Sequence, residues 1–483
     1  MSAAQTVMMQ ATDAAAWMAG AHLVGPDAAI CRVTTDSRAV EPGDLFVALI
    51  GERFDAHDFL PEVVARGAAA VLVSRAPAAT LDVSSVAVLT VADTRIGLGQ
   101  LAAGWRRQFP IPVVAVTGSN GKTTVKEMIS AIFAQAVGED ARLATAGNFN
   151  NDIGLPLTLF RLNAQHKLAV LELGMNHPGE TAVLATIAQP TVAMINNAQR
   201  EHQEFMVSVE AVAQEHAAVL AALPADGVAV FPRDAANGGE YAPVWQAAAG
   251  SRRVLDFGIE AGAVTGTVAD TADGQRIDVQ APGQRFVITL PLLGLHNARN
   301  ALAATACALA AGVTPEVIAQ ALGNFAPVKG RLQRKHGTHG GLVIDDTYNA
   351  NPDSMRAAID ALVTLPAPRW LVLGDMGEVG SQGPAFHEEI GAYAREHGID
   401  AVLATGALAR HTVDAFGAGA QHFASAEDLI EHGVPAIAPA ATVLVKGSRF
   451  MRMERIVEAL VLKDPAAQVA TQAPAGSSTQ QKH

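Results

Sequence analysis

The chain has 483 residues, which at roughly 150 residues per domain corresponds to about three domains. Half of the residues are hydrophobic and 17% are charged, a composition that excludes global disorder. The formal net charge of -13 argues against a nucleic-acid coat or an anionic membrane surface as the main partner, but it leaves room for a local basic phosphate site.

Cysteine usage and the N-terminal segment indicate the cellular compartment. Cys31 and Cys307 lie far apart in the sequence, so a disulfide framework does not organise the fold. The segment up to Met18 lacks the basic start and the sustained apolar run of a signal peptide. No stretch approaches the ~20 apolar residues that a membrane span needs. We therefore expect a cytoplasmic protein without a membrane span.

Residues 1–108 are expected to form an N-terminal α/β domain. Short apolar runs at 45–49 and 70–73 predict strands, and a helical pattern at 59–66 lies between them. The segment 109–112 contains two prolines, which interrupt regular pairing and stiffen linkers, and it therefore marks the end of this block.

Residues 109–327 are expected to form a central domain with a parallel sheet. Strands and helices alternate in this block, which implies helices on both faces of the sheet. The segment 264–290 predicts additional antiparallel strands, and an Ala-rich helix is expected at 297–311. The other expected elements are strands at 113–116, 168–171 and 192–196 and a helix at 125–137.

Residues 328–463 are expected to form a second, Rossmann-like α/β domain. Its predicted strands, separated by helical segments, are at 342–344, 370–373, 401–404 and 442–445. The segment 464–483 is rich in Ala, Gln, Ser and Pro and is predicted to be a disordered tail. The sequence therefore predicts an α/β protein of three domains.

The strongest motif is the run TGSNGKTT at residues 117–124, between a buried strand and a helix. Its glycines allow the backbone N–H groups to point at phosphate oxygens, and the helix N-terminus adds its positive end. Lys122 would reach the outer phosphates, and the Thr123 hydroxyl could hold magnesium. The expected phosphate contacts are Gly118, Ser119, Asn120, Gly121, Lys122, Thr123 and Thr124.

This loop is shorter than the standard Walker loop, because only Ser119 and Asn120 separate Gly118 from Gly121. A simple Gly-rich turn is the alternative, but the strand, the loop and the helix coincide as phosphate binding requires. By itself the motif allows a kinase, a GTPase or a ligase.

Together with motifs downstream, the loop resembles that of the Mur ligase family, whose members couple ATP hydrolysis to amide-bond formation on UDP-linked peptidoglycan precursors. The resemblance covers about residues 30–450. In the first block, TDSR at 35–38 and PGDLFVAL at 42–49 resemble the family's UDP-binding domain, which implies substrate contacts for Ser37 and Arg38.

Motifs of the central block resemble further parts of the family's site. The loop TAGNFNNDIGLP at 145–156 implies contacts between the UDP-muramoyl substrate and Asn148, Asn150 and Asn151. The runs ELGMNHPGE at 172–180 and NAQREHQEF at 197–205 imply that Glu172 and His202 serve magnesium. The run GLHNARN at 294–300 implies adenine-side contacts for Asn297 and Asn300.

The third block extends the resemblance. Arg331, in the run KGR, matches an ATP-contacting arginine. The run DDTYNANP at 345–352 resembles the members that add D-alanyl-D-alanine, whereas their relatives carry Asp-Tyr-Ala-His. The resemblance implies nucleotide contacts for Arg331 and Asp346, and substrate contacts for Asn349, Lys446 and Arg449.

The resemblance implies an enzyme that joins D-alanyl-D-alanine to a UDP-N-acetylmuramoyl-tripeptide through an acyl phosphate, using ATP and Mg²⁺. Its catalytic residues would be Lys122, Glu172, His202 and Arg331, and His177 is a candidate general base. We expect a monomer. Alternatives are a sister ligase that adds one amino acid, a folylpolyglutamate-type synthetase, and a regulatory protein that hydrolyses nucleotide without making a bond.

Each of these residues has an ordinary alternative when it is taken singly. Glu172 and His202 could be surface residues, and Asn297 and Asn300 could cap a helix. Asp345 and Asp346 could be turn residues, and Lys446 and Arg449 an exposed basic cluster. The order of so many motifs in one chain favours the functional interpretation.

One position departs from the family pattern. Most members carry a lysine, carbamylated by carbon dioxide, on the helix after the His202 motif, and the alignment places His216 there. No lysine occurs between Lys167 and Lys329, so a shifted alignment cannot restore it. His216 could bind the metal directly, hold a water or an ATP phosphate instead, or simply pack. Because magnesium prefers oxygen ligands, we favour a role beside the metal or a phosphate over direct binding.

Overall fold

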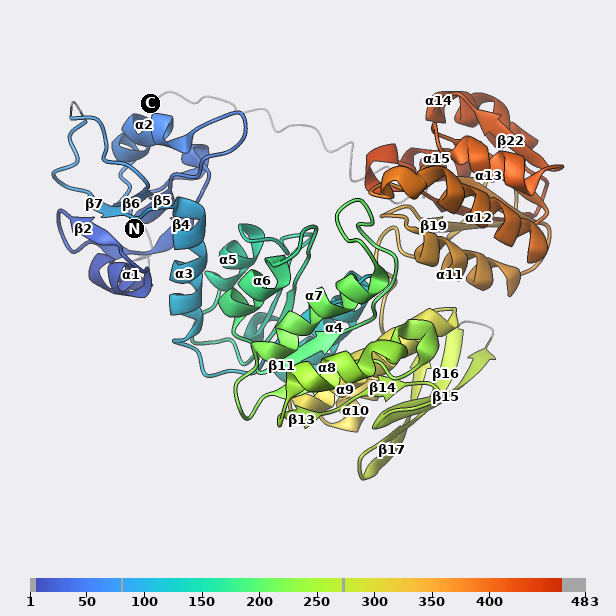
Figure 1. Cartoon of the computed structure of the whole chain (residues 1–483), viewed down its shortest axis with the longest axis horizontal. Helices are drawn as coiled ribbons and strands as arrows, with labels where there is room; N and C mark the ends of the chain where they lie inside the picture. The colour runs from blue at the N-terminus through green and yellow to red at the C-terminus, as the bar shows by residue number, and fades with distance from the viewer. Residues whose placement is uncertain (1–5, 80, 272–273, 463–483) are drawn as a thin grey trace, which may run out of the picture. The chain divides into compact units, whose positions relative to one another are not determined.

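The computed structural model describes residues 6–79, 81–271 and 274–462 (Figure 1). The chain divides into two compact units between Ala326 and Pro327. The boundary expected between residues 108 and 109 lies inside the first unit. The expected tail at 464–483 lies outside the described residues.

The N-terminal region contains a five-stranded sheet in the order β2-β7-β6-β5-β4, parallel except for β2. Every residue of β5 and β6 is buried, as expected for parallel strands that are covered on both faces. The strands are β2 (His22–Val24), β4 (Arg32–Thr34), β5 (Asp44–Val47), β6 (Ala70–Val73) and β7 (Ala87–Thr90). The other elements are β1 (Met9–Gln10), β3 (Ala29–Ile30), α1 (Ala11–Trp17), α2 (Leu60–Ala65) and α3 (Thr94–Arg106).

The central region contains the predicted parallel sheet, in the order β13-β12-β11-β8-β10-β9. Its strands are β8 (Val113–Thr117), β9 (Arg142–Ala144), β10 (Leu168–Glu172), β11 (Val192–Ile195), β12 (Val228–Val230) and β13 (Arg253–Val254). Its helices are α4 (Lys122–Val137), α5 (Gly154–Leu159), α6 (Glu180–Ala188), α7 (Val209–Ala221) and α8 (Ala242–Ala249).

The direction of winding in this sheet reverses around β8. The chain passes from β8 through α4 toward the β9 edge, and it passes from β10 through α6 back across β8 to β11. Because such crossovers are right-handed, α4 and α6 cover opposite faces of the sheet. Ligands of open α/β sheets bind at the carboxyl ends of the strands at this kind of reversal.

The predicted antiparallel strands form a second, four-stranded sheet in the order β14-β15-β16-β17. β16 pairs antiparallel with both β15 and β17, which confirms the interpretation of 264–290. The elements are β14 (Phe257–Gly258), β15 (Val264–Thr271), β16 (Gly274–Ala281), β17 (Gln284–Leu290), α9 (Leu295–Ala310) and α10 (Pro315–Gly323).

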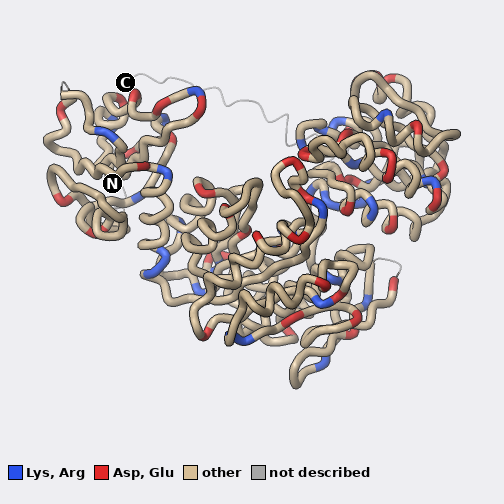
Figure 2. The backbone as a smooth tube through the Cα atoms, in the orientation of Figure 1, with Lys and Arg blue, Asp and Glu red and all other residues tan. Residues whose placement is uncertain are grey.

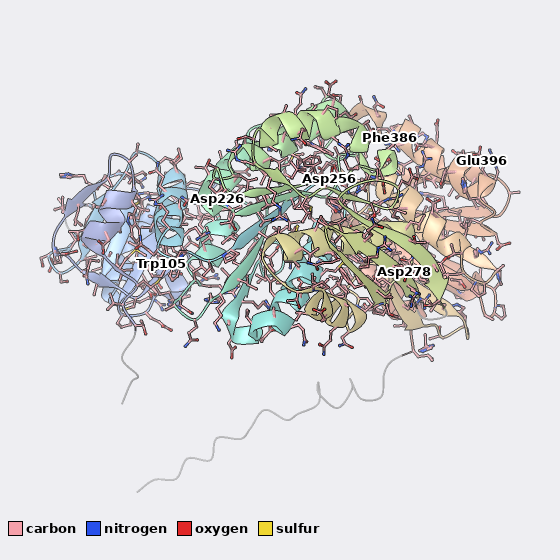
Figure 3. All side chains as sticks on the ribbon, turned by 90° about the horizontal axis from the view of Figure 1, so that it is seen from below. Trp105, Asp226, Asp256, Asp278, Phe386 and Glu396 are labelled. Carbon is pink, nitrogen blue, oxygen red and sulfur yellow. The ribbon has the colours of Figure 1, made fainter. Side chains whose placement is uncertain are left out.

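Helix α3 joins the N-terminal sheet to the central sheet. Leu101 and Trp105 of α3 belong to one buried apolar cluster that extends through both regions. The indole Nε1 of Trp105, labelled in Figure 3, donates a hydrogen bond of 3.2 Å to the carbonyl oxygen of Leu162. A Cβ at Gly99 would lie 2.8 Å from Cδ1 of Ile187 in α6, so the two helices approach closely. Because they share this core, the first two expected domains form one compact unit.

The C-terminal unit contains a six-stranded sheet in the order β18-β19-β23-β20-β21-β22, in which only β18 is antiparallel to its neighbour. This sheet confirms the second α/β unit that the sequence predicts near the C-terminus. The strands are β18 (Gln333–His336), β19 (Leu342–Asp346), β20 (Arg369–Leu373), β21 (Ala401–Thr405), β22 (Ala420–Phe423) and β23 (Thr442–Lys446). The helices are α11 (Pro352–Val363), α12 (Gly383–Glu396), α13 (Ala409–Phe416), α14 (Ala426–Asp428) and α15 (Glu454–Leu460).

Charged residues are distributed over both units. Figure 2 shows Lys and Arg interspersed with Asp and Glu along the backbone. Across the described ranges, no helix is both long enough and apolar enough to cross a bilayer.

The shared core predicts a large effect of truncating Leu101. Leu101→Ala removes a fully buried side chain, and we expect the free energy of unfolding of the first unit to fall by about 2–5 kcal/mol. The matched control is Ile96→Ala on the same helix, because Ile96 is 61% exposed and its truncation should change stability by about 0.5 kcal/mol or less. Urea denaturation followed by tryptophan fluorescence measures both. Equal effects of the two variants would contradict the shared core.

Candidate active site at the phosphate loop

The phosphate loop follows β8, at the point where the winding of the central sheet reverses. Gly118 and Gly121 have φ values of 129° and 76°, in a region that residues with a Cβ atom rarely adopt. A Cβ at Gly118 would lie 2.9 Å from the backbone nitrogens of Asn196 and Asn197. A Cβ at Gly121 would lie 2.7 Å from Oδ1 of Asn300. Glycine is therefore required at both positions by backbone conformation and by the space available.

A polar segment after β11 braces the loop. The backbone N–H of Asn120 donates to Oδ1 of Asn197 at 2.7 Å, and Nδ2 of Asn196 donates to the Asn120 carbonyl oxygen at 2.7 Å. Nδ2 of Asn120 donates to Oε1 of Gln199 at 2.7 Å, and the backbone N–H of Ser119 donates to the Asn197 carbonyl oxygen at 3.2 Å. The residues that follow β11, the strand next to β8, therefore hold the phosphate loop in its conformation.

Lys122 begins α4, three residues before the start expected from the sequence, because the left-handed Gly121 ends the loop there. Its ammonium donates to the carbonyl oxygen of Gly118, to that of Ser119 at 3.1 Å, and to Oε2 of Glu201 at 3.2 Å. The side chain is only 16% exposed. The lysine therefore lies over the loop, where an incoming phosphate would meet it.

Glu201 is a buried carboxylate that faces this lysine, and it is not among the site residues predicted from the sequence. Its Oε1 accepts from Nε2 of His216 at 2.9 Å, and its Oε2 lies 3.7 Å from Nε2 of His202. Burial alone raises the pKa of Glu201, but the charge of Lys122, the hydrogen bond from His216 and the charges of both histidines together lower it to about 2. The group is therefore ionised at every pH at which the protein would be assayed. The only signal for it in the sequence was its place beside His202.

Glu172 lies on the other side of β8, at the carboxyl end of β10. Its Oε1 accepts from Nδ2 of Asn150 at 2.9 Å, so the structure brings these two predicted residues together. Its backbone N–H donates to Oγ1 of Thr145 at 3.0 Å. Its Oε2 is buried and, within the part of the chain that the structure describes, has no hydrogen-bond partner. A buried, unpaired carboxylate oxygen is a suitable ligand for a cation.

The residues present fit a magnesium ion. Magnesium is usually held by one or two carboxylates together with substrate phosphates and waters, and rarely by an all-protein cage. The described residues contain no group of three or more His, Cys, Asp or Glu that could hold a metal ion. Thr123, in the first turn of α4, and Glu172 supply oxygen donors, whereas His202 offers nitrogen and lies beside Glu201.

Asn297 and Asn300 lie in the first turns of α9, and both are buried. Nδ2 of Asn297 donates to the Leu293 carbonyl oxygen at 2.8 Å, and Oδ1 of Asn300 accepts from Asn196 at 2.9 Å. Asn300 thus attaches the start of α9 to the segment that braces the phosphate loop, whereas Asn297 bonds to the residues just before its own helix. Their contact with adenine stays a prediction.

The predicted UDP contacts belong to the N-terminal region. Arg38 is 84% exposed, and its guanidinium donates two hydrogen bonds of 2.9 Å to Asp36. The bond from Arg38 lowers the pKa of Asp36 to about 2. Ser37 begins the short 3₁₀ turn that carries Arg38. This pair is a compact polar group, and its role in substrate binding stays a prediction.

The two other predicted asparagines of the central loop shape the backbone. Oδ1 of Asn151 accepts from the backbone N–H of Gly154 at 2.8 Å, at the start of α5. The carbonyl oxygen of Asn148 accepts from the backbone N–H of Asn150 at 2.7 Å. Both residues therefore help to hold Asn150 beside Glu172.

In the C-terminal unit, four predicted residues lie at the carboxyl ends of β19 and β23 or directly after them, and Arg331 contacts this group through Tyr348. The ammonium of Lys446 donates to Oδ2 of Asp346 at 2.7 Å and to the Asn349 carbonyl oxygen at 2.9 Å. The guanidinium of Arg331 lies 4.2 Å from the centre of the Tyr348 ring, and that of Arg449 lies 6.0 Å from it. The unit thus presents cations and polar groups together at one sheet edge.

His177, the candidate general base, lies near the start of α6. Its Nδ1 is 3.2 Å from Oε1 of Glu180, and its ring centre is 4.5 Å from that of Phe205. More than half of its side chain is exposed. It is accessible to a substrate, and its role stays a prediction.

Three family profiles match the chain in order. They are described as Mur ligase family, catalytic domain, at residues 29–106, Mur ligase middle domain at 116–308, and Mur ligase, glutamate ligase domain, at 330–449. These matches confirm the three-domain α/β architecture.

Relatives extend the similarity to most of the chain. The UDP-N-acetylmuramoyl-tripeptide–D-alanyl-D-alanine ligase of Escherichia coli is 42% identical over 444 residues, which are 91% of this chain and 95% of that protein. The ligase of the same name from Bacillus subtilis is 35% identical and covers 89% of this chain and 93% of its own length.

Solved structures agree with these relatives. A crystal structure of MurF from Acinetobacter baumannii has a TM-score of 0.86 at 35% identity and covers 94% of this chain and 99% of its own. MurF from Thermotoga maritima, in complex with ADP, has a TM-score of 0.78 at 27% identity and covers 89% and 96%. With relatives above 30% identity over nine-tenths of its length and three matching profiles in order, the chain belongs to the Mur ligase family.

Proposed function

We propose that this chain joins D-alanyl-D-alanine to UDP-N-acetylmuramoyl-tripeptide and hydrolyses ATP to do so, giving the UDP-muramoyl-pentapeptide precursor of peptidoglycan. The observation that carries the proposal is the braced phosphate loop between two buried carboxylates, Glu172 and Glu201. The 42% identity to a ligase of this name over 91% of the chain supports the choice of substrates.

The tripeptide carboxylate is a poor electrophile, and the reaction must first make it reactive. The tripeptide carboxylate attacks the γ-phosphorus of ATP, which forms an acyl phosphate and releases ADP. The amine of D-alanyl-D-alanine then attacks the acyl carbon, a tetrahedral intermediate collapses, and inorganic phosphate leaves with the amide in place. The amine must be deprotonated, and water must be excluded, because water would hydrolyse the acyl phosphate.

The first step brings two anions together, and the loop offsets their repulsion. The backbone N–H groups of the loop and the N-terminus of α4 provide positive potential for the phosphates. Lys122 adds a full charge that can follow the transferred phosphoryl group. We propose that magnesium is held by Thr123 and Glu172 with His202 nearby, where it would neutralise charge on the phosphates.

We propose the remaining contacts from the places that the predicted residues occupy. Ser37 and Arg38 serve the UDP group, and Asn148, Asn150 and Asn151 serve the muramoyl substrate. The nucleotide contacts are Asn297, Asn300, Arg331 and Asp346. The remaining substrate contacts are Asn349, Lys446 and Arg449. The bond from Lys446 to Asp346 and the position of Arg449 near the Tyr348 ring support this assignment.

We also propose that the enzyme acts in the cytoplasm as a monomer. Its substrates, ATP and a UDP-linked precursor, are cytoplasmic compounds. A single chain matches all three Mur ligase domain profiles, which supports a monomer as the active form. The domain boundaries at 108 and 327 remain part of this proposal.

Removing the loop lysine tests the assignment of the phosphate site. Lys122→Ala deletes the charge that faces the transferred phosphoryl group, and kcat should fall about 100-fold or more with folding intact. ADP release measured with both substrates present gives the rate. The matched control is Lys167→Ala, because Lys167 is an exposed lysine of the same region and should be replaceable. Near-normal turnover of Lys122→Ala would disprove the site.

A competition assay tests the second substrate. We expect D-alanyl-D-alanine to be joined about 100-fold faster than L-lysine, meso-diaminopimelate or D-glutamate. A site built to bind both ends of a dipeptide keeps some of its polar groups without a hydrogen-bond partner when a single amino acid binds, and this loss slows the reaction. Mass spectrometry of the UDP-linked products reports the preference. Preference for a single amino acid would make the chain a sister ligase, and phosphate release without either substrate would favour a regulatory protein.

Dependence on carbon dioxide tests the role of position 216. A histidine cannot form a stable carbamate, so turnover in bicarbonate-free, carbon-dioxide-purged buffer should equal turnover after bicarbonate is added back. The activity of the purged enzyme is measured first, and bicarbonate is then added to the same sample. A large, reversible rescue would mean that a carbamate contributes to turnover after all, and that the alignment of His216 with the family's lysine is wrong.

A further inference from the structure

Glu201 is the buried charged group of the site for which the proposed mechanism has no role. Its side chain is 5% exposed, although it lies in a loop. Each of its oxygens is directed at the phosphate-loop region, Oε1 through His216 and Oε2 toward Lys122. Burying a carboxylate is unfavourable unless cations and hydrogen bonds compensate it, so its position requires an explanation.

His216 is held on both ring nitrogens. Its Nδ1 lies 3.0 Å from Oγ1 of Thr117, the last residue of β8, and its Nε2 lies 2.9 Å from Glu201. Nε2 donates its proton to the Glu201 carboxylate, and the other ring nitrogen is held by the Thr117 hydroxyl. The ring is fully buried, and neither nitrogen can reach a metal without breaking one of these bonds. His216 therefore fixes the orientation of Glu201 and leaves Oε2 for another partner.

Lys122 cannot remain the partner of Glu201 once nucleotide is bound. Its ammonium has three protons, and it now directs them to two loop carbonyl oxygens and to Oε2 of Glu201. When phosphates occupy the loop, Lys122 turns to them. Glu201 then loses its main counter-charge while it stays buried, which is costly unless another cation replaces the lysine.

We propose that Glu201 is an oxygen ligand of the divalent cation that accompanies the nucleotide, with His216 as its positioning residue. The inference rests on the proposed function, because the cation arrives with ATP. Two carboxylates, Glu172 on one side of β8 and Glu201 on the other, would then serve the ion, a number that suits magnesium. The chain thereby carries a permanent carboxylate next to position 216, and no carbon dioxide adduct is needed.

The test measures metal binding apart from turnover. Glu201→Gln keeps the size of the side chain and the bond from His216 but removes the charge. Mn²⁺ binding to the full chain saturated with a non-hydrolysable ATP analogue is measured by electron paramagnetic resonance. We expect the affinity for Mn²⁺ to fall about tenfold or more, as for the loss of an oriented ligand. Binding of the analogue without metal should be unchanged or tighter, because Lys122 is released from Glu201.

Two further variants separate a ligand from a structural residue. Glu204→Gln is the matched control, because Glu204 is an exposed glutamate of the same loop and should leave Mn²⁺ binding unchanged. Glu201→Asp keeps the charge and should bind Mn²⁺ more tightly than Glu201→Gln, whereas a structural role would make the two equally poor. Thermal unfolding confirms that each variant is folded.

Two results would overturn the proposal. One is unchanged Mn²⁺ affinity in Glu201→Gln, and the other is an equal loss of metal-free nucleotide binding, which would make Glu201 a support of the loop alone. Failure of the proposed function is distinct from both. In that case the unaltered chain binds Mn²⁺ and nucleotide through Glu201 but makes no UDP-muramoyl-pentapeptide.

Discussion

The hydrogen bonds between the phosphate loop and the segment after β11 are the interactions on which the rest of the site depends. Asn196 and Asn197 hold the loop backbone of Ser119 and Asn120, and Gln199 holds the side chain of Asn120. Each bond contributes only about 1 kcal/mol to stability, but together they order the loop before nucleotide arrives. Donors fixed in advance need no reorganisation during the reaction, which is the main source of electrostatic catalysis.

The order of strands in the central sheet explains why the charged groups meet. β8 lies between β10 and β11, so residues that follow these strands reach the loop from its two sides. Glu172 arrives at the end of β10, and Glu201 arrives a few residues after β11. His216 comes from the buried face of α7 and ties Glu201 to Thr117 at the end of β8. Three strands that are adjacent in the sheet thus carry polar groups to the region of the phosphate loop.

The sequence was sufficient for features whose cause is local. The phosphate loop could be predicted because its glycines, lysine and threonines are neighbours in the chain, and the central strands because fully buried parallel strands are continuous apolar runs. Glu201 could not be selected, since its burial depends on the phosphate loop, which is 79 residues away in sequence at Lys122, and on the orientation of α7, which brings His216 to it. Asn300 was expected at adenine, yet its side chain also accepts a hydrogen bond from Asn196 in the segment after β11, which spacing alone does not reveal.

The continuous core around α3 affects how the protein can change during evolution. Helix α3 contacts both α5 and α6, and its apolar residues are part of the same cluster as the central strands. The N-terminal region is therefore not an interchangeable module. A chimera that exchanged residues 1–108 between distant relatives would place an unfamiliar helix surface against α5 and α6 and leave gaps or clashes between them. Substitutions on α3 should accordingly be accompanied by substitutions at its partners, such as Ile187, which lies against Gly99.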